Sequence, residues 1–223
     1  MKRTRIADRS GVRELPASAV LDPGTLLAGD GPLELEIGFG KGRYLLRRAA
    51  EDPGRRFCGI EIANEYFRLA ARRLVHRRLD NLLLLEGDAA YFATALLPPG
   101  RFAAVHVYFP DPWPKLRHQK RRLFSPEAID LVAGLVAPGG RFWFATDFLE
   151  YGAGVRRILE GYPGARVVEL EGGWPDGART NYEAKYVAEG RPIVRLEVAF
   201  DAPAALHPDG AVKILVAARP TAG

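Results

Sequence analysis

The side chains best suited to chemistry lie in one segment of this sequence, YFPDPWPKLRHQKRR at residues 108–122. The segment follows an apolar run with the length and β-branched content of a buried strand, and its prolines cannot continue a strand's hydrogen bonding. Asp111 is therefore expected at a strand exit. The basic side chains that follow are dense enough to suit several phosphates rather than one carboxylate. They are Lys115, Arg117, Lys120, Arg121 and Arg122. A reactive acid beside a nucleic-acid-binding cluster is one interpretation, and a solvated basic loop is the other.

A second candidate is the glycine-rich loop EIGFGKG at residues 36–42. In an open α/β sheet, the loop after the first strand usually forms the floor of a ligand site, and Gly38 and Gly40 let the backbone approach a ligand closely. Arg43 stands where the dinucleotide fingerprint has its third glycine, and Glu36 would repel a pyrophosphate. S-adenosylmethionine has no phosphate and carries sulfonium and ammonium charges. The loop therefore favours this cofactor over NAD.

Two further acids end the next apolar runs. Glu61 lies 23 residues after Gly38, close to the spacing of about 20 expected for a carboxylate that binds ribose hydroxyls. Asp88 follows the third run and is placed to accept from an adenine amino group. Each acid alone is compatible with a turn or helix cap. Three acids at successive strand ends predict a cofactor that contains adenosine.

These residues require a framework that brings strand ends together. Apolar runs alternate with helical patterns five times, which predicts a doubly wound α/β fold with a mostly parallel sheet. The last three runs have no helical pattern between them, which predicts an antiparallel hairpin at one sheet edge. The expected strands are 33–37, 56–62, 81–87, 102–109, 141–147, 165–171, 193–200 and 211–218, and the expected helices are 43–51, 64–79, 89–96, 126–136 and 149–159.

Length and composition indicate one large domain. The chain has 223 residues, of which 48% are hydrophobic, enough for a core without metals or disulfides. We expect residues 1–30 to be an irregular basic arm, residues 31–223 to be the catalytic domain, and residues 201–223 to add a C-terminal strand. The net charge of +5 is compatible with a polyanionic partner.

Several classes of function are disfavoured. The sequence contains no apolar stretch of about 20 residues and no signal-peptide pattern, so we expect no membrane partner. Cys58 is the only cysteine, which favours a reducing compartment, and a cytoplasmic location is expected. The histidines show no metal-ligand spacing, so we expect no metal. No serine lies in a G-x-S-x-G elbow.

With these motifs, the sequence resembles the bacterial tRNA (guanine-N7)-methyltransferases, which are Rossmann-like class I S-adenosylmethionine-dependent enzymes. The resemblance covers about residues 33–200. Its most specific parts are EIGFGKG (36–42), GIEI (59–62), FPDPWPKLRHQKRR (109–122), ATDF (145–148) and TNYE (180–183). Tyr182 departs from the phenylalanine that is frequent in the family but keeps a ring able to stack. The resemblance does not extend over residues 201–223.

The resemblance implies a substrate and a set of site residues. The substrate would be a guanosine in the variable loop of tRNA, at position 46 of the tRNA. Asp111 would join Glu36, Gly38, Gly40, Glu61 and Asp88 at the cofactor, while Lys115, Asp147, Thr180, Asn181, Tyr182 and Glu183 would face the nucleotide. Arg117, Lys120, Arg121 and Arg122 are expected to contact the RNA backbone. Whether the chain acts as a monomer or a homodimer is left open.

The chemistry of guanine N7 defines what the protein has to do. N7 carries a free lone pair at neutral pH, so its methylation requires no prior proton removal. The protein must align N7 with the methyl group and compensate the positive charge that moves onto the purine. Asp111 is the first candidate for this catalytic role and Asp147 the second. Turn-capping aspartates are the alternative interpretation.

Other functions remain open at this stage. A nicotinamide oxidoreductase is the rival among enzymes, and a basic RNA-binding module with an unused pocket is the rival outside them. The helix expected at residues 64–79 carries Arg68, Arg72, Arg73, Arg77 and Arg78. It either extends the RNA-binding cluster or is an ordinary solvated amphipathic helix.

Overall fold

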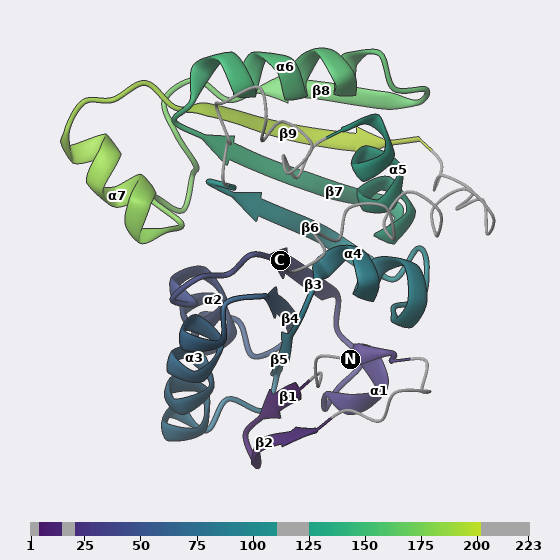
Figure 1. The fold of residues 1–223 in the computed structure, drawn as a ribbon, viewed down its shortest axis with the longest axis vertical. Coiled ribbons are helices and arrows are strands. Elements are labelled where there is room, and N and C mark those ends of the chain that lie inside the picture. The colour runs from purple at the N-terminus through teal and green to yellow at the C-terminus, as the bar shows by residue number, and fades with distance from the viewer. Residues whose placement is uncertain (1–4, 15–20, 111–124, 202–223) are drawn as a thin grey trace, which may run out of the picture.

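A computed structural model of the chain describes residues 5–14, 21–110 and 125–201, which fold around one nine-stranded sheet (Figure 1). The strand order is β2-β1-β5-β4-β3-β6-β7-β9-β8. The strands are β1 (Arg5–Asp8), β2 (Gly11–Glu14), β3 (Leu33–Ile37), β4 (Arg56–Glu61), β5 (Leu82–Glu86), β6 (Phe102–Tyr108), β7 (Val136–Thr146), β8 (Ala165–Glu169) and β9 (Val194–Phe200).

The central strands β5, β4, β3, β6 and β7 are parallel. Helices cover both of their faces, which is why β3, β4 and β5 are nearly continuous runs of buried residues. The chain runs outward from β3 through β4 to β5 and then crosses back to β6, so the strand order reverses between β3 and β6. The predicted doubly wound, mostly parallel sheet is confirmed.

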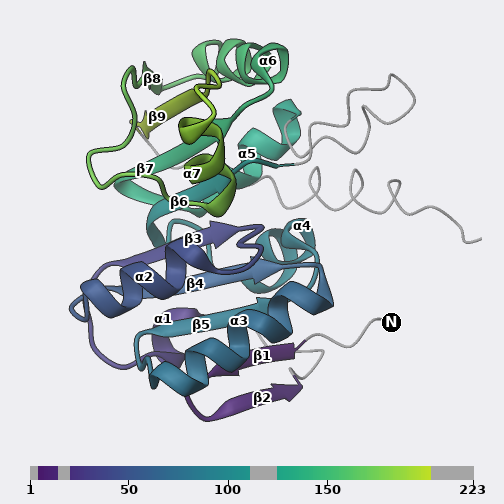
Figure 2. The ribbon, with the colours of Figure 1, turned by 90° about the vertical axis from the view of Figure 1, so that its left-hand side faces the viewer.

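The helices form two layers. They are α1 (Pro23–Leu26), α2 (Arg43–Glu51), α3 (Asn64–Arg77), α4 (Ala89–Tyr91), the π-helix η1 (Phe92–Leu96), α5 (Pro126–Leu135), α6 (Leu149–Glu160) and α7 (Asn181–Ala188). Figure 2 shows α2 and α3 on the side turned toward the viewer, with α7 on the same side in front of β6 and β7. The buried residues fall into two core clusters. One contains the buried side chains of α2 and α3, and the other contains those of η1, α5 and α6.

The N-terminal segment differs from the expected irregular arm. Residues 5–14 form β1 and β2, and β1 pairs antiparallel with β5 on one side and with β2 on the other. Ile6 and Ala7 are buried, so this short hairpin covers the edge of the leucine-rich strand β5. Strands of four residues are too short to show a period in the sequence, which explains the error. The domain boundary expected at residue 30 stays a prediction.

The C-terminal edge is antiparallel, as predicted: β9 pairs with both β7 and β8. The expectation that no helix separates the late strands is wrong, because α7 lies between β8 and β9. The only buried residue of α7 is Glu183, so no apolar period marks this helix in the sequence. The strand expected at 211–218 lies outside the part of the chain that the structure describes.

Candidate active site

The three predicted acids lie at or near the ends of adjacent parallel strands. Glu36 lies near the end of β3, Glu61 ends β4, and Asp88 lies two residues after β5. In the sheet register, Ile37 pairs with Ile60 and Glu61 pairs with Glu86, so these strands end at one edge. The topological reversal beside β3 places this edge where open α/β sheets bind ligands.

The glycine loop after β3 has an open side. Gly38 and Gly40 have φ angles of 73° and 52°, and a Cβ atom built on either would meet no atom within 4 Å. At Gly42, with φ 72°, a Cβ would lie 3.1 Å from the Cβ of Ala70, so this glycine also lets α2 pack against α3. Gly38 and Gly40 thus present bare backbone toward free space.

Glu61 shapes this loop. Its Oε2 accepts a hydrogen bond of 2.8 Å from the amide of Gly40, and its Oε1 accepts one of 2.8 Å from the amide of Ala63. The carboxylate therefore joins the glycine loop to the turn that leads into α3. The structure adds this loop-holding contact to the ribose-binding role expected from the sequence, which stays a prediction.

Glu36 is the least satisfied acid of the site. Its side chain is buried with 2% exposed, and Oε2 has no hydrogen-bond partner among the described residues. Burial and the neighbouring charge of Glu61 raise the pKa of Glu36 to about 8, against the opposing effects of Arg179 and the Leu45 backbone. A buried carboxyl oxygen without a partner is costly unless a ligand supplies one. Glu36 is thus suited to a cationic ligand group.

Asp88 is exposed and caps α4. Its Oδ1 accepts from the amide of Ala90 at 2.9 Å, which satisfies one of the free amides in the first turn. The capping role considered for this residue is therefore present. Its predicted contact with an adenine amino group remains a prediction.

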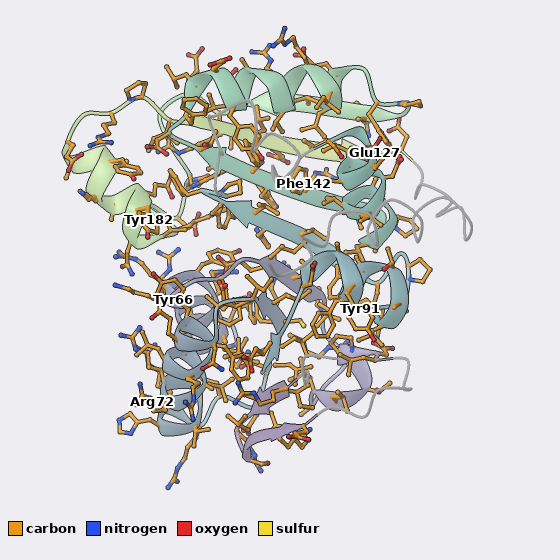
Figure 3. The ribbon with its side chains drawn as sticks, in the orientation of Figure 1. Tyr66, Arg72, Tyr91, Glu127, Phe142 and Tyr182 are labelled. Carbon is orange, nitrogen blue, oxygen red and sulfur yellow. The ribbon has the colours of Figure 1, made fainter. Side chains whose placement is uncertain are left out.

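The TNYE segment, at the start of α7, contacts the residue that follows the glycine loop. Asn181, the first residue of α7, accepts a hydrogen bond of 3.0 Å from Nη1 of Arg43, the first residue of α2. Tyr182 is 56% exposed, and Figure 3 shows it facing Tyr66 in the first turn of α3. The neighbouring Tyr182 phenol, together with Glu65, raises the pKa of Tyr66. The segment thus lies at the mouth of the candidate site.

Thr180 and Glu183 hold α7 in place. Thr180 is the N-cap, and its Oγ1 accepts from the amide of Glu183 at 3.0 Å. Glu183 is buried, and its two oxygens accept from the amide of Arg179 at 2.8 Å and from Nε of Arg195 at 2.7 Å. The structure therefore gives Glu183 an anchoring role, and its expected contact with the nucleotide stays a prediction.

Asp147 lies directly after β7 and is half-buried. Its Oδ2 lies 3.9 Å from Nη1 of Arg191, a weak and partly exposed ion pair. One carboxylate oxygen is thus within reach of a cation of the chain, and the residue stands at the same sheet edge as the other acids. Its role at the nucleotide stays a prediction.

Sequence reasoning missed a buried polar chain behind the site. Arg179 Nη1 donates to the Tyr108 hydroxyl at 2.6 Å, Tyr108 lies 2.8 Å from Nδ1 of His106, and Nε2 of His106 lies 3.2 Å from Oε2 of Glu34. Burial lowers the pKa of His106. A neutral ring that accepts from Tyr108 and donates to Glu34 satisfies all these contacts.

Arg179 is enclosed by aromatic rings. Its guanidinium carbon lies 4.3 Å from the centroid of the Trp174 ring and 4.8 Å from that of Trp143. Such cation–π contacts are strongest where water is excluded, and the residue is only 7% exposed. The position of Arg179 directly before the TNYE motif could have marked it as a site residue. Nothing in the sequence indicated its contacts with the distant tryptophans.

The predicted catalytic and phosphate-binding residues lie outside the described part of the chain. These are Asp111, Lys115, Arg117, Lys120, Arg121 and Arg122. The structure does show the exit of β6. Phe109 has a φ of 51°, unusual for a residue other than glycine, and its amide donates to the carbonyl of Ala145 at 2.7 Å. The strand therefore turns sharply just before the PDPWPK segment.

Neither a metal centre nor a membrane span is found within the described residues. There, no group of three or more histidine, cysteine, aspartate and glutamate side chains is arranged to hold a metal ion. In the same part of the chain, no helix has the length and apolar character needed to cross a membrane.

Solved structures share the fold. A 16S rRNA methyltransferase, KamB, superposes with a TM-score of 0.64 at 18% identity and covers 89% of this chain and 100% of its own. A mutant of the 16S rRNA (adenine(1408)-N(1))-methyltransferase of Catenulisporales acidiphilia, solved with its cosubstrate, superposes with a TM-score of 0.59 at 15% identity and covers 90% and 98%. The architecture is the Rossmann-like fold of class I methyltransferases.

Sequence relatives are much closer. Residues 30–196 match the family model described as "Putative methyltransferase". The tRNA (guanine-N(7)-)-methyltransferase of Geobacter metallireducens is 38% identical over 73% of this chain and 79% of its own. That of Nitrosococcus oceani is 37% identical over 71% and 67%. With its glycine loop and its acids at three strand ends, the chain belongs to the tRNA (guanine-N(7)-)-methyltransferase family.

Proposed function

We propose that this protein transfers the methyl group of S-adenosylmethionine to N7 of a guanosine in tRNA, in the variable loop at position 46. Family membership supports the reaction. The observation that carries the cofactor assignment is Glu36, a buried acid at the end of β3 with an unpartnered oxygen, among the described residues, beside bare glycine backbone.

The residues present fit this cofactor. The open sides of Gly38 and Gly40 leave room for close approach, and Glu36 offers an acceptor to an ammonium group. Glu61 and Asp88, at the next two strand ends, would hold the ribose and the adenine, and Asp111 would complete the pocket from the exit of β6. When bound, S-adenosylmethionine supplies an electrophilic methyl group on a sulfonium.

The residues of the chain then have to position the guanine base. Asp111 would orient the guanine by accepting from its N–H groups and would stabilise the positive charge that develops on the ring. Asp147 and Lys115 would contact the same nucleotide, with Thr180 and Asn181 supporting it from α7. The exposed ring of Tyr182 is suited to stack on a base.

Binding of the RNA itself would depend on cations outside the described residues. Arg117, Lys120, Arg121 and Arg122 would contact the backbone of the tRNA. We further propose that the protein acts in the cytoplasm, as a monomer or a homodimer.

The reaction is tested with unmodified tRNA and labelled S-adenosylmethionine, followed by mapping of the label. Label on N7 of guanosine 46 is the expected result, and label on another atom would contradict it. Binding of NAD but not S-adenosylmethionine in calorimetry would support the oxidoreductase rival instead. Binding of tRNA without methyl transfer would support the RNA-binding rival.

Two variants separate catalysis from binding. Asp111→Ala should lower kcat about 100-fold and leave the unfolding temperature unchanged, because the residue acts on the charge of the transition state. Lys115→Ala should instead weaken tRNA binding and lower its salt dependence. An unchanged kcat in the first variant would remove Asp111 from the mechanism.

A further inference from the structure

Helix α3 presents a row of exposed cations to solvent. Figure 3 shows Arg72 projecting outward from this helix. Four further arginines of this helix and its C-cap are also exposed: Arg68, Arg73, Arg77 and Arg78. We call these five arginines the α3 face. A helix of 14 residues is about 20 Å long, so the face is long enough to follow several consecutive phosphates.

The five arginines of the α3 face have no acidic partner among the described residues. None of its five arginines forms an ion pair with another described residue, and only backbone carbonyls, those of Lys41 and Leu46, accept hydrogen bonds from Arg73 and Arg77. On α6, by contrast, Arg156 contacts both Glu160 and Glu169. An unpaired row of one sign attracts a polyanion.

The α3 face is continuous with the mouth of the candidate site. Arg73 donates to the carbonyl of Lys41 in the glycine loop at 3.1 Å. Tyr66, on the first turn of α3, faces Tyr182 of the TNYE segment (Figure 3). An RNA whose guanosine enters between these elements would therefore pass its neighbouring backbone along α3.

The opposite side of α3 favours a nucleic acid rather than a membrane as the partner. A helix that binds a lipid surface inserts an apolar face into it. In α3 that face is already used, since Phe67, Ala70, Ala71 and Leu74 are at most 1% exposed against the sheet and α2. Val75 alone among its large aliphatic side chains is exposed. The solvent-facing surface of α3 is therefore charged and has no apolar stripe that could insert into a membrane.

We propose that the α3 face binds the phosphate backbone of the RNA substrate next to the methylated guanosine. This inference rests on the proposed function for the identity of the RNA. It adds a second cationic contact to the cluster predicted from the sequence at residues 115–122.

The test is the double variant Arg68→Gln/Arg72→Gln, because neither side chain forms a hydrogen bond with another described residue and the fold should be unaffected. The control is Arg157→Gln/Arg166→Gln on α6 and β8, which removes the same charge at the far end of the sheet and, with it, the exposed ion pair of Arg166 with Asp201. The dissociation constant for unmodified tRNA is measured at salt concentrations from about 50 to about 300 mM, a range over which phosphate contacts lose most of their affinity.

The α3 variant should bind about tenfold more weakly at the lower salt concentrations, with the slope of log K against log salt reduced by about 2, and the control should match the unchanged protein. In methylation assays KM for tRNA should rise while kcat at saturation is kept. Equal effects of the two variants would overturn the proposal. So would loss of binding to anionic phosphatidylserine vesicles without any change in tRNA binding.

The proposed function fails in a different way. If the unchanged protein formed no 7-methylguanosine, the function would be wrong, whatever the α3 variant did. If the unchanged protein methylated N7 and the α3 variant kept the tRNA affinity and salt slope of the control, only the proposal that the α3 face binds RNA would be wrong.

Discussion

Two buried glutamates of β3 differ in their hydrogen-bond partners and in the direction of their pKa shifts. Glu34 and Glu36 lie two residues apart on one face of the sheet and are 5% and 2% exposed. Glu34 accepts from Arg55 at 2.8 Å, from His106 at 3.2 Å and from Tyr44 at 3.3 Å. Burial opposes its charge, but the His106 hydrogen bond and the nearby cations hold its pKa at about 2. Glu36 has an oxygen without a partner among the described residues and a pKa raised to about 8.

The difference separates a structural acid from a ligand-binding one. Near neutral pH, Glu34 is ionised and joined to the buried chain that reaches Arg179 through His106 and Tyr108. Glu36 is largely protonated and has spare acceptor capacity at the open glycine loop. Burial alone would assign both residues to one class, and their partners tell them apart.

Removing Glu34 should produce the largest effect on stability. In Glu34→Ala, His106 and Tyr44 lose a buried acceptor, and breaking a buried charged network costs about 3 kcal/mol of unfolding free energy. Chemical denaturation measures it. The control is Glu197→Gln, whose pair with Arg141 is partly exposed and should be worth less than about 1 kcal/mol. Equal losses would show that the Glu34 network does not stabilise the fold.

Changing Glu36 should affect binding instead. Glu36→Gln removes the acceptor for a cationic ligand group, so the dissociation constant of S-adenosylmethionine should rise about 100-fold, or about 2.7 kcal/mol. The unfolding free energy at pH 7 should stay the same or increase, because a buried acid is lost. Calorimetry and denaturation measure the two effects. A destabilised variant with unchanged affinity would show that Glu36 is a structural acid and not a ligand-binding one.

The same variant has a proton signature. Binding of a cation to protonated Glu36 should release close to one proton at pH 7, and calorimetry in buffers of different ionisation enthalpy detects it. Glu36→Gln should release none. Proton release that persists in this variant would assign the titration to another group.

The contributions of the two acids to stability should also change with pH in opposite directions. The pKa of Glu36 is about 8 in the folded protein against an ordinary value of 4.5, so the folded state holds the extra proton and stability falls as pH rises between these values. The advantage of Glu36→Gln should therefore grow by about 1 kcal/mol per pH unit from about pH 5 to about pH 8. Glu34, with a pKa of about 2, contributes stability above its ordinary value of 4.5 that is lost as pH falls through 2. Denaturation at stepped pH tests both signs.

The smallest change removes one hydroxyl group. Tyr44→Phe keeps the ring that packs against His106 but deletes the 3.3 Å hydrogen bond to Glu34. Stability should fall by about 0.5–1 kcal/mol, with cofactor affinity unchanged. A larger loss of affinity than of stability would mean that Tyr44 acts at the ligand site.

The sequence predicted the positions of strand ends better than the contacts made there. Glu36, Glu61 and Asp88 lie at the ends of apolar runs, and runs of that kind indicate parallel strands, so their common edge could be foreseen. The partners of these acids could not. Whether Glu61 holds Gly40, or one oxygen of Glu36 is left without a partner among the described residues, depends on loop geometry that no periodicity encodes.

Long-range contacts account for the remaining errors. The chain from Arg179 to Glu34 joins residues far apart in sequence, and His106 alone in an apolar strand gave no sign of it. Helix α7 was missed because it packs through Glu183 rather than through apolar residues. Asp111 and the basic residues after it are still assigned from sequence alone.

The N-terminal hairpin has a consequence for handling the protein. Without β1, the backbone of β5 would be an open edge on the strand Leu82–Glu86, four of whose residues are leucines. Such an edge recruits strands from other molecules. The hairpin replaces it with β2, a short strand whose Arg13 and Glu14 are exposed. Deleting residues 1–14 should therefore cause aggregation before it affects catalysis.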